Sequence, residues 1–182
     1  MNDGSVIAFI SAPGVGKSFL TKQMACKNMA PGFFEGEAGI FPQSVLDVLN
    51  SEMDTEERYV WITSRLKMML ERAHAIARLG IDCYVDGDVL LVESWLRAEI
   101  GTESPNFLQK WLADNVHLMA HKVIVLTATD EKIRENIQKR NRATEQTEFI
   151  QERAFRIGQA CLDLAEKYPH AKVVDRTQLD FT

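Results

Sequence analysis

A lysine and a serine follow two glycines near the start of the chain, in a pattern suited to holding phosphate. The segment Ser11–Ser18 reads SAPGVGKS. Gly14 and Gly16 allow the backbone to curl so that successive N–H groups point inward at a polyphosphate. Lys17 can reach the β- and γ-phosphates of a nucleotide, and the hydroxyl of Ser18 can bind Mg²⁺. The spacing therefore predicts a nucleoside triphosphate site, although a serine opens the motif where the usual pattern has glycine.

The segments around this motif give it the structural context that a phosphate-binding loop (P-loop) requires. Residues 6–10, VIAFI, are apolar without a break, as in a strand buried on both faces. Residues 19–27 favour a helix that starts near Lys17, whose free amides and positive dipole end would attract an anion. The residues expected to bind the nucleotide are Ala12, Pro13, Gly14, Val15, Gly16, Lys17, Ser18 and Phe19.

Polar side chains end several further predicted strands, at 33–37, 81–86 and 122–126. Ligands of parallel sheets gather beyond the carboxyl ends of the strands. We therefore expect the polar residues at these ends to lie near the phosphate site. They are Glu35, Glu37, Asp86, Asp88 and Thr127.

Helices alternate with the strands along the rest of the chain. They are expected at 44–49, 56–79, 106–120, 131–140 and 148–167, and a last strand at 171–175. Gly80 stands where a helix C-cap glycine belongs. After Asp86 the pattern allows a hairpin turn into 89–92 or a helix over 89–100, and Trp95–Glu99 favours the helix. The alternation predicts one α/β domain over residues 1–182, with a five-stranded parallel sheet covered on both faces.

Composition excludes some classes of protein. The chain has 182 residues, 46% of them hydrophobic and 26% charged, which is ordinary for a globular domain. A net charge of −5 argues against a protein that holds duplex nucleic acid through its phosphates. Cys26, Cys83 and Cys161 are widely spaced, as expected of reduced thiols in a cytoplasmic protein. Without a leader before Val6 or an apolar run long enough for a membrane span, we expect neither export nor membrane insertion.

On these motifs the chain resembles the deoxynucleoside kinases, within the wider group of nucleoside and nucleoside monophosphate kinases. The resemblance covers most of the chain in the same order, beginning with the P-loop and the strand that ends at Glu35. The run Thr63–Lys67, TSRLK, is similar to the N-S-R-F-K of the family, and Asp86 stands where the family has D/E-R-S. Lys139–Glu145, KRNRATE, is similar to the arginine-rich lid R-x-R-x-x-E.

The resemblance implies a three-layer α/β/α P-loop kinase fold and phosphoryl transfer from Mg-ATP. Glu35 would be the general base that takes a proton from the attacking hydroxyl, with Glu37 as its competitor. Arg65 would orient the substrate. Asp86, together with Ser18, would hold Mg²⁺.

The lid, at about 139–147, would bring Arg140 and Arg142 over the phosphates to stabilise charge on the transferring group. Family members are often dimers, so a homodimer is also implied.

Departures from the family leave the acceptor open. Gly87 stands where the family has arginine, and positions expected to shape the base pocket carry Met53 and Glu56 or Arg58. A deoxynucleoside, a nucleoside monophosphate and a modified base all remain candidates for the acceptor. The competing functions are a P-loop ATPase or GTPase switch and a nucleotide-binding regulator that has lost catalysis.

Overall fold

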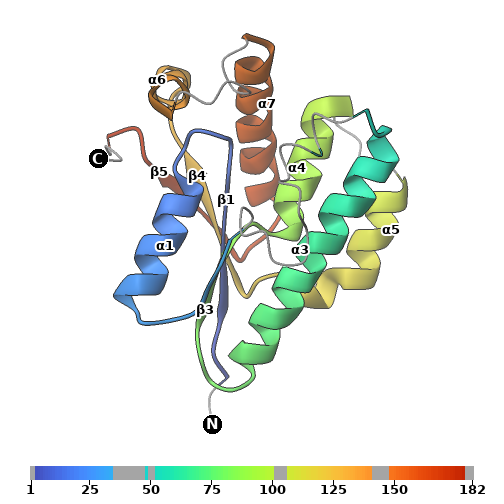
Figure 1. Ribbon diagram of the computed structural model, residues 1–182, viewed down its shortest axis with the longest axis vertical. Helices are drawn as coiled ribbons and strands as arrows, with labels where there is room; N and C mark the ends of the chain where they lie inside the picture. Colours follow the sequence, from blue (N-terminus) through green and yellow to red (C-terminus); the bar gives the residue numbers. More distant parts are fainter. Residues whose placement is uncertain (1–2, 35–47, 49–51, 101–105, 141–147, 179–182) are drawn as a thin grey trace.

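The strand that precedes the P-loop lies at the centre of one parallel sheet (Figure 1). The computed structural model describes residues 3–34, 48, 52–100, 106–140 and 148–178. Within these ranges the strands are β1 (Val6–Ser11), β2 (Gly32–Phe33), β3 (Cys83–Asp86), β4 (Lys122–Thr127) and β5 (Ala171–Asp175). Their order is β2-β3-β1-β4-β5, and every pair is parallel. The predicted five-stranded parallel sheet is confirmed.

Helices cover both faces of this sheet, which confirms the three-layer arrangement. They are α1 (Lys17–Lys27), α3 (Thr55–Ala77), α4 (Val89–Ile100), α5 (Asn106–Asn115), α6 (Asp130–Arg140) and α7 (Glu148–Ala165). Helix α1 lies on one face, and α3, α4 and α7 lie on the other (Figure 1). None of the helices in the described ranges is long and apolar enough to cross a membrane.

The unbroken apolar run of β1 serves two cores. Val6, Ala8 and Ile10 pack into a cluster with side chains of α3, α4 and α7. Ile7 and Phe9 point to the opposite face and pack into a cluster with side chains of α1 and α6. Because successive strand side chains alternate between faces, a central strand covered by helices on both sides must be apolar at every position.

Local signals in the sequence set the ends of α3. The Asp54 side chain accepts a hydrogen bond from the Glu57 N–H at 2.8 Å and so caps the first turn. Gly80 has a φ of +84°, and its N–H donates to the Ala77 carbonyl at 2.9 Å. The helix spans Thr55–Ala77 rather than 56–79 and its C-cap residue is Arg78, so Gly80 ends the turn that follows the helix instead of capping it.

The helix favoured after Asp86 is confirmed as α4, but other predicted bounds are wrong. Helix α5 stops at Asn115 instead of near residue 120, and a 3₁₀ turn, η1 (Val116–Leu118), follows it. The Asn115 side chain donates to the Trp111 carbonyl at 2.8 Å and so competes with the backbone of the helix end.

Two predicted strands also differ from those observed. Strand β3 starts at Cys83 rather than Ile81, and Phe34 is not part of β2, which is Gly32–Phe33. Residues 35–37 lie outside the described residues, as does the predicted helix 44–49 except for Val48.

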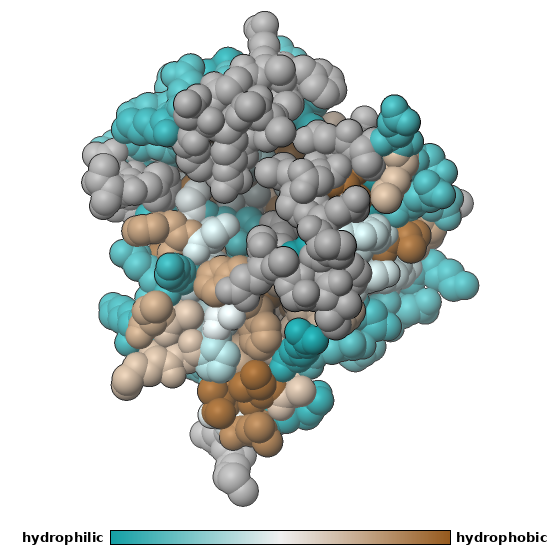
Figure 2. Space-filling view, in the orientation of Figure 1, coloured by the Kyte–Doolittle hydropathy of each residue, from teal (hydrophilic) through white to brown (hydrophobic). Residues whose placement is uncertain are grey.

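Exposed hydrophobic side chains gather at the end of the molecule opposite the P-loop. In Figure 2 they are the brown group near the lower end, where Figure 1 shows α3 leading into β3. Leu79 and Ile81 lie in that connection and are exposed. The carboxyl ends of the strands, where ligands of such sheets bind, therefore lie away from this apolar group.

Candidate active site

The loop between β1 and α1 has the backbone that a phosphate cradle requires. Gly14 and Gly16 have φ angles of +91° and +90°, in the left-handed region that favours glycine. Gly16 is the N-cap residue of α1, and no side chain caps that helix end. The first amides of α1 therefore remain available to an anion, and the loop fits the phosphates of a nucleotide.

The serine that opens the motif is accommodated inside the protein. Ser11 is 1% exposed, and its hydroxyl donates to the Ala12 carbonyl at 2.9 Å. Its side chain satisfies its own hydrogen-bonding needs next to the loop, so the departure from glycine does not disturb the cradle.

Lys17 and Asp86 form the charged centre of the site. The Lys17 Nζ lies 2.6 Å from Oδ1 of Asp86, with the two side chains 12% and 2% exposed. Lys17 is the first residue of α1, and Asp86 ends β3, the strand beside β1. Ser18 lies next to Lys17 in the first turn of α1 and is exposed. A serine hydroxyl and a carboxylate are the hard oxygen ligands that Mg²⁺ prefers, so this donor set fits the metal.

A pocket of about 410 Å³, including space open to solvent, adjoins Asp86. It lies between α3, the turn after β3, and α4. Its walls are mainly apolar, with the aromatic side chains of Tyr59 and Trp95, and its charged side chains include Arg65 and Asp86. Such an apolar cavity with a few polar groups is typical of small-molecule sites. Asp86 contacts Lys17 and also lines the pocket, so the loop that contains Gly14 and Gly16 and the pocket lie on either side of Asp86.

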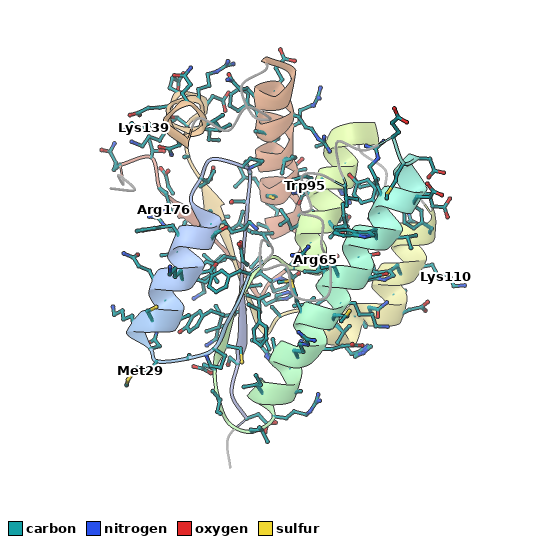
Figure 3. All side chains as sticks on the ribbon, in the orientation of Figure 1. Met29, Arg65, Trp95, Lys110, Lys139 and Arg176 are labelled. Atoms are coloured by element: carbon teal, nitrogen blue, oxygen red, sulfur yellow. The ribbon has the colours of Figure 1, made fainter. Side chains whose placement is uncertain are left out.

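Arg65 reaches this pocket from the middle of α3, while Trp95 comes from the neighbouring α4 (Figure 3). Arg65 is 4% exposed, and its guanidinium carbon lies 5.7 Å from the centroid of the Trp61 ring. A buried arginine held against an aromatic ring has a defined position and presents donors to an anionic or polar ligand. The structure thus places Asp86 and Arg65 on one pocket, with Lys17 in contact with Asp86.

The remaining predicted residues are not placed in this way. Glu35, Glu37 and Arg142 lie outside the described residues. Arg140 is the last residue of α6, and only its backbone is described. Phe19 lies in the first turn of α1 with 42% of its surface exposed.

Asp88 proves to be a structural acid. It is fully buried: its Oδ1 accepts the Leu90 N–H and its Oδ2 the Ala120 N–H, both at 3.1 Å. Burial raises the pKa of Asp88, and the two backbone hydrogen bonds and the nearby His170 and His74 oppose that shift. Both carboxylate oxygens are thus used in joining the start of α4 to the entry of β4. An aspartate directly before an apolar helix is the N-cap signal that could have revealed this role.

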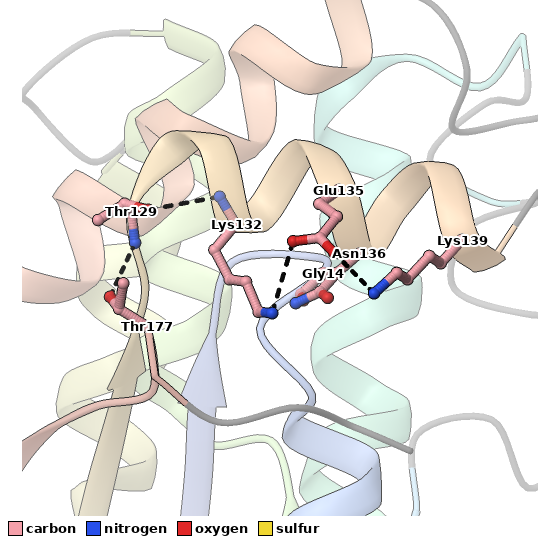
Figure 4. A network of polar contacts seen from close by, with 7 residues as sticks. All are labelled: Gly14, Thr129, Lys132, Glu135, Asn136, Lys139 and Thr177. Carbon is pink, nitrogen blue, oxygen red and sulfur yellow. Dashed lines mark hydrogen bonds and ion pairs between the residues drawn. The ribbon is translucent and has the colours of Figure 1, made fainter.

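Sequence reasoning missed Asn136, which contacts the phosphate loop itself. Its Nδ2 donates to the Gly14 carbonyl at 2.9 Å, and the side chain is 7% exposed (Figure 4). Ile133 and Ile137, on the same helix α6, pack near Gly14. Their i, i+4 spacing is typical of a buried helix face, but no sequence signal indicates that the loop is its partner.

Comparisons with known proteins support the fold. No family model matches the chain, and no curated protein matches it by sequence. Deoxyadenosine kinase from M. mycoides, solved with dCMP and a flexible dCDP, is 16% identical with a TM-score of 0.72, over 96% of this chain and 92% of that chain. Thymidylate kinase from Candida albicans is 12% identical with a TM-score of 0.73, over 98% of this chain and 86% of that chain. The fold of these kinases is therefore the fold of this chain.

Proposed function

We propose that this chain, which has the fold of deoxynucleoside and nucleotide kinases, transfers the γ-phosphoryl group of ATP to a nucleoside or nucleoside monophosphate. The observation that carries the proposal is the position of Asp86, between the phosphate loop at Lys17 and the pocket that contains Arg65. Phosphoryl transfer needs a donor site and an acceptor site that meet at one charged centre.

On the donor side, the amides of the loop and of the first turn of α1 bind the phosphate oxygens. The Lys17 ammonium gives up part of its contact with Asp86 and contacts the β- and γ-phosphates. Negative charge grows on the oxygen that bridges these two phosphates as its bond to the γ-phosphorus breaks, and Lys17 stabilises that charge. Ser18 and Asp86 would hold Mg²⁺, which would supply positive charge to offset that of the phosphates.

On the acceptor side, the apolar walls of the pocket bind the base or sugar, and Arg65 orients the acceptor by hydrogen bonding. Glu35 remains our candidate for the general base, and Arg140 and Arg142 for the cations that close over the phosphates. We further propose that the enzyme works in the cytoplasm, where its three unpaired thiols stay reduced, and that it forms a homodimer.

A transfer assay with a panel of acceptors tests the proposal. Purified protein is incubated with Mg²⁺ and γ-labelled ATP, together with each deoxynucleoside or each monophosphate. We expect ADP to form in proportion to a labelled product, and only when the right acceptor is present. Lys17→Ala abolishes transfer, whereas Lys22→Ala, an exposed lysine on the same helix, leaves it unchanged. Release of phosphate at full rate with no acceptor would instead identify an ATPase switch.

Gly87 favours one second candidate, a nucleotide-binding regulator without catalysis. It occupies the place of the arginine in the kinase motif, and its φ of +133° suits glycine rather than arginine. Under this alternative the protein binds ATP but transfers nothing to any member of the panel.

A further inference from the structure

We propose that Asn136 is a positioning residue for the phosphate loop. Its side chain fixes the peptide group of Gly14 so that the loop is already shaped for phosphate before the nucleotide arrives. The inference rests on the proposed nucleotide site, but it concerns a residue outside the motif, contributed by a helix more than a hundred positions later in the chain.

The contact is buried and acts on the backbone at the apex of the loop. Asn136 Nδ2 donates to the Gly14 carbonyl at 2.9 Å. In a trans peptide the carbonyl and the following N–H point in opposite directions. By drawing the Gly14 carbonyl toward α6, Asn136 therefore turns the Val15 N–H away from α6. The orientation of that amide is a property on which a phosphate cradle depends.

The loop needs such a support because its glycines make it flexible. Gly14 and Gly16 both have positive φ angles, and glycine reaches many other conformations at little cost. A Cβ added to Gly14 would lie 3.0 Å from Cγ1 of Ile137 and 3.1 Å from the Ile133 carbonyl oxygen. Helix α6 thus packs directly against the apex, and its polar contact with the loop comes from Asn136.

Helix α6 is itself held firmly enough to serve as a support. Ile133 and Ile137 are 3% and 0% exposed and belong to the core beside α1. At the start of the helix the Thr129 N–H donates to the Thr177 hydroxyl at 3.2 Å, which joins α6 to the segment after β5 (Figure 4). On its outer face Glu135 pairs with Lys132 and Lys139. A rigid helix with one buried donor is a means of pre-organising a flexible loop.

Asn115 provides a matched control for mutagenesis. It is 5% exposed, and its Nδ2 donates to the Trp111 carbonyl at 2.8 Å. Asn115→Ala therefore removes the same kind of hydrogen bond from an equally buried asparagine, but on α5, away from the loop. Asn136→Ala removes the contact with the loop, and Asn136→Leu removes it while keeping a similar side-chain volume and adding no charge.

The experiment measures the Kd of Mg-ATP and of inorganic tripolyphosphate by calorimetry, with thermal unfolding of each variant alongside. We expect both Asn136 variants to bind both ligands about 10-fold more weakly or worse, as for the loss of one buried hydrogen bond. We expect Asn115→Ala to lower the Tm by a similar amount but to keep the wild-type affinity. Equal affinity in wild type and Asn136 variants overturns the proposal, as does an equal loss of affinity in Asn115→Ala or failure of both Asn136 variants to fold.

The outcome is independent of whether the protein is a kinase. If phosphate transfer occurs and the Asn136 variants bind ATP normally, the kinase assignment stands and the positioning role fails. If no acceptor is phosphorylated but the Asn136 variants lose ATP affinity, the positioning role stands and the kinase assignment fails.

Discussion

The ammonium nitrogen of Lys17 lies 2.6 Å from Oδ1 of Asp86, so the lysine of the phosphate loop is paired with the acid at the end of the neighbouring strand. Sequence reasoning assigned these residues to different partners, one to phosphate and the other to Mg²⁺. The contact shows that they also neutralise each other. If the phosphates of a nucleotide draw Lys17 away from Asp86, another cation must pair with Asp86. A buried carboxylate without a partner is strongly unfavourable.

This pairing predicts opposite effects of Asp86→Asn on two properties. Binding of ATP in the presence of EDTA should become tighter, since Lys17 loses its competing anion. Turnover with Mg²⁺ should fall by about 10²–10³-fold, as when one preorganised electrostatic contact is lost. Calorimetry with and without Mg²⁺ and the transfer assay check both. Asp114→Asn, on the exposed side of α5, is the control, and wild-type turnover in Asp86→Asn would contradict the prediction.

Arg65→Gln should weaken acceptor binding selectively. Because Arg65 lines the pocket and not the loop, we expect the KM of the acceptor to rise about 10- to 100-fold, as for the loss of a charged hydrogen bond, while the Kd of ATP is unchanged. Steady-state kinetics with each substrate varied in turn measures the difference. Arg72→Gln, an exposed arginine on the same helix, should behave as wild type. An equal rise in the KM of the acceptor and the Kd of ATP would show that Arg65 supports the whole site.

Gly87→Ala should destabilise the protein by about 1–2 kcal/mol through its backbone alone. The φ of Gly87 is +133°, but an added Cβ would meet only ordinary contacts, the nearest being Cδ1 of Leu66 at 3.6 Å. Gly158→Ala, inside α7, should instead stabilise by about 0.5–1 kcal/mol, because helix propensity favours alanine. Its Cβ would lie 3.5 Å from that of Ala12. Chemical denaturation measures both, and the prediction fails if the two changes have the same sign.

The three thiols should differ sharply in reactivity. Cys26 is exposed, whereas Cys83 and Cys161 are buried. Burial raises the pKa of Cys161 to about 11, and its Sγ donates to the Ser94 hydroxyl at 3.2 Å. Since the thiolate is the reactive form, iodoacetamide at pH 8 should label one cysteine in the folded protein and three in denaturant. Mass spectrometry of the labelled peptides counts them, and rapid native labelling of Cys161 would be contrary to this structure.

His121 should make the protein less stable in mild acid. Its pKa is lowered from 6.5, first by burial and then by the nearby His74, while its Nδ1 accepts the Val6 N–H at 2.8 Å. The unfolded chain therefore binds the proton more readily, so stability present above pH 6.5 is lost as the pH falls through the lower folded value.

Replacement of this ring separates its titration from its hydrogen bond. His121→Asn keeps an acceptor near the position of Nδ1 but does not titrate, so its free energy of unfolding should vary less with pH, by about 0.5 kcal/mol. Denaturation at several pH values from 7 down to about 5 measures the difference. The exposed His117→Asn should follow the wild type, and identical pH profiles for wild type and His121→Asn would refute the assignment.

The parts of the fold that could be predicted are those determined by residues close together in the sequence. The apolar run of β1 and the glycine spacing after it are sufficient to place the glycine-rich loop between β1 and α1. The helical continuation through Trp95–Glu99 was enough to choose a helix over a hairpin for α4. These signals depend on residues that are neighbours in the chain, where propensity and periodicity act directly.

The parts that could not be predicted depend on contacts between distant segments. In the sequence Asp88 resembles the other acids at strand ends. In the structure its carboxylate accepts a hydrogen bond from the Ala120 N–H, which gives it a structural role. Asn136 reads as a polar residue on an amphipathic helix, although it reaches the loop at Gly14. Glu35 and Arg142 stay predictions of the resemblance, because they lie outside the described residues.

The central position of β1 has a consequence for how the protein matures on the ribosome. The strand and its loop are synthesised before the strands that flank β1, which come with Cys83–Asp86 and Lys122–Thr127. The amide that braces the loop comes later still, at Asn136. A nascent chain that stops before Asn136 carries the whole motif yet lacks this hydrogen bond, so the proposed nucleotide site is complete only after α6 has been synthesised.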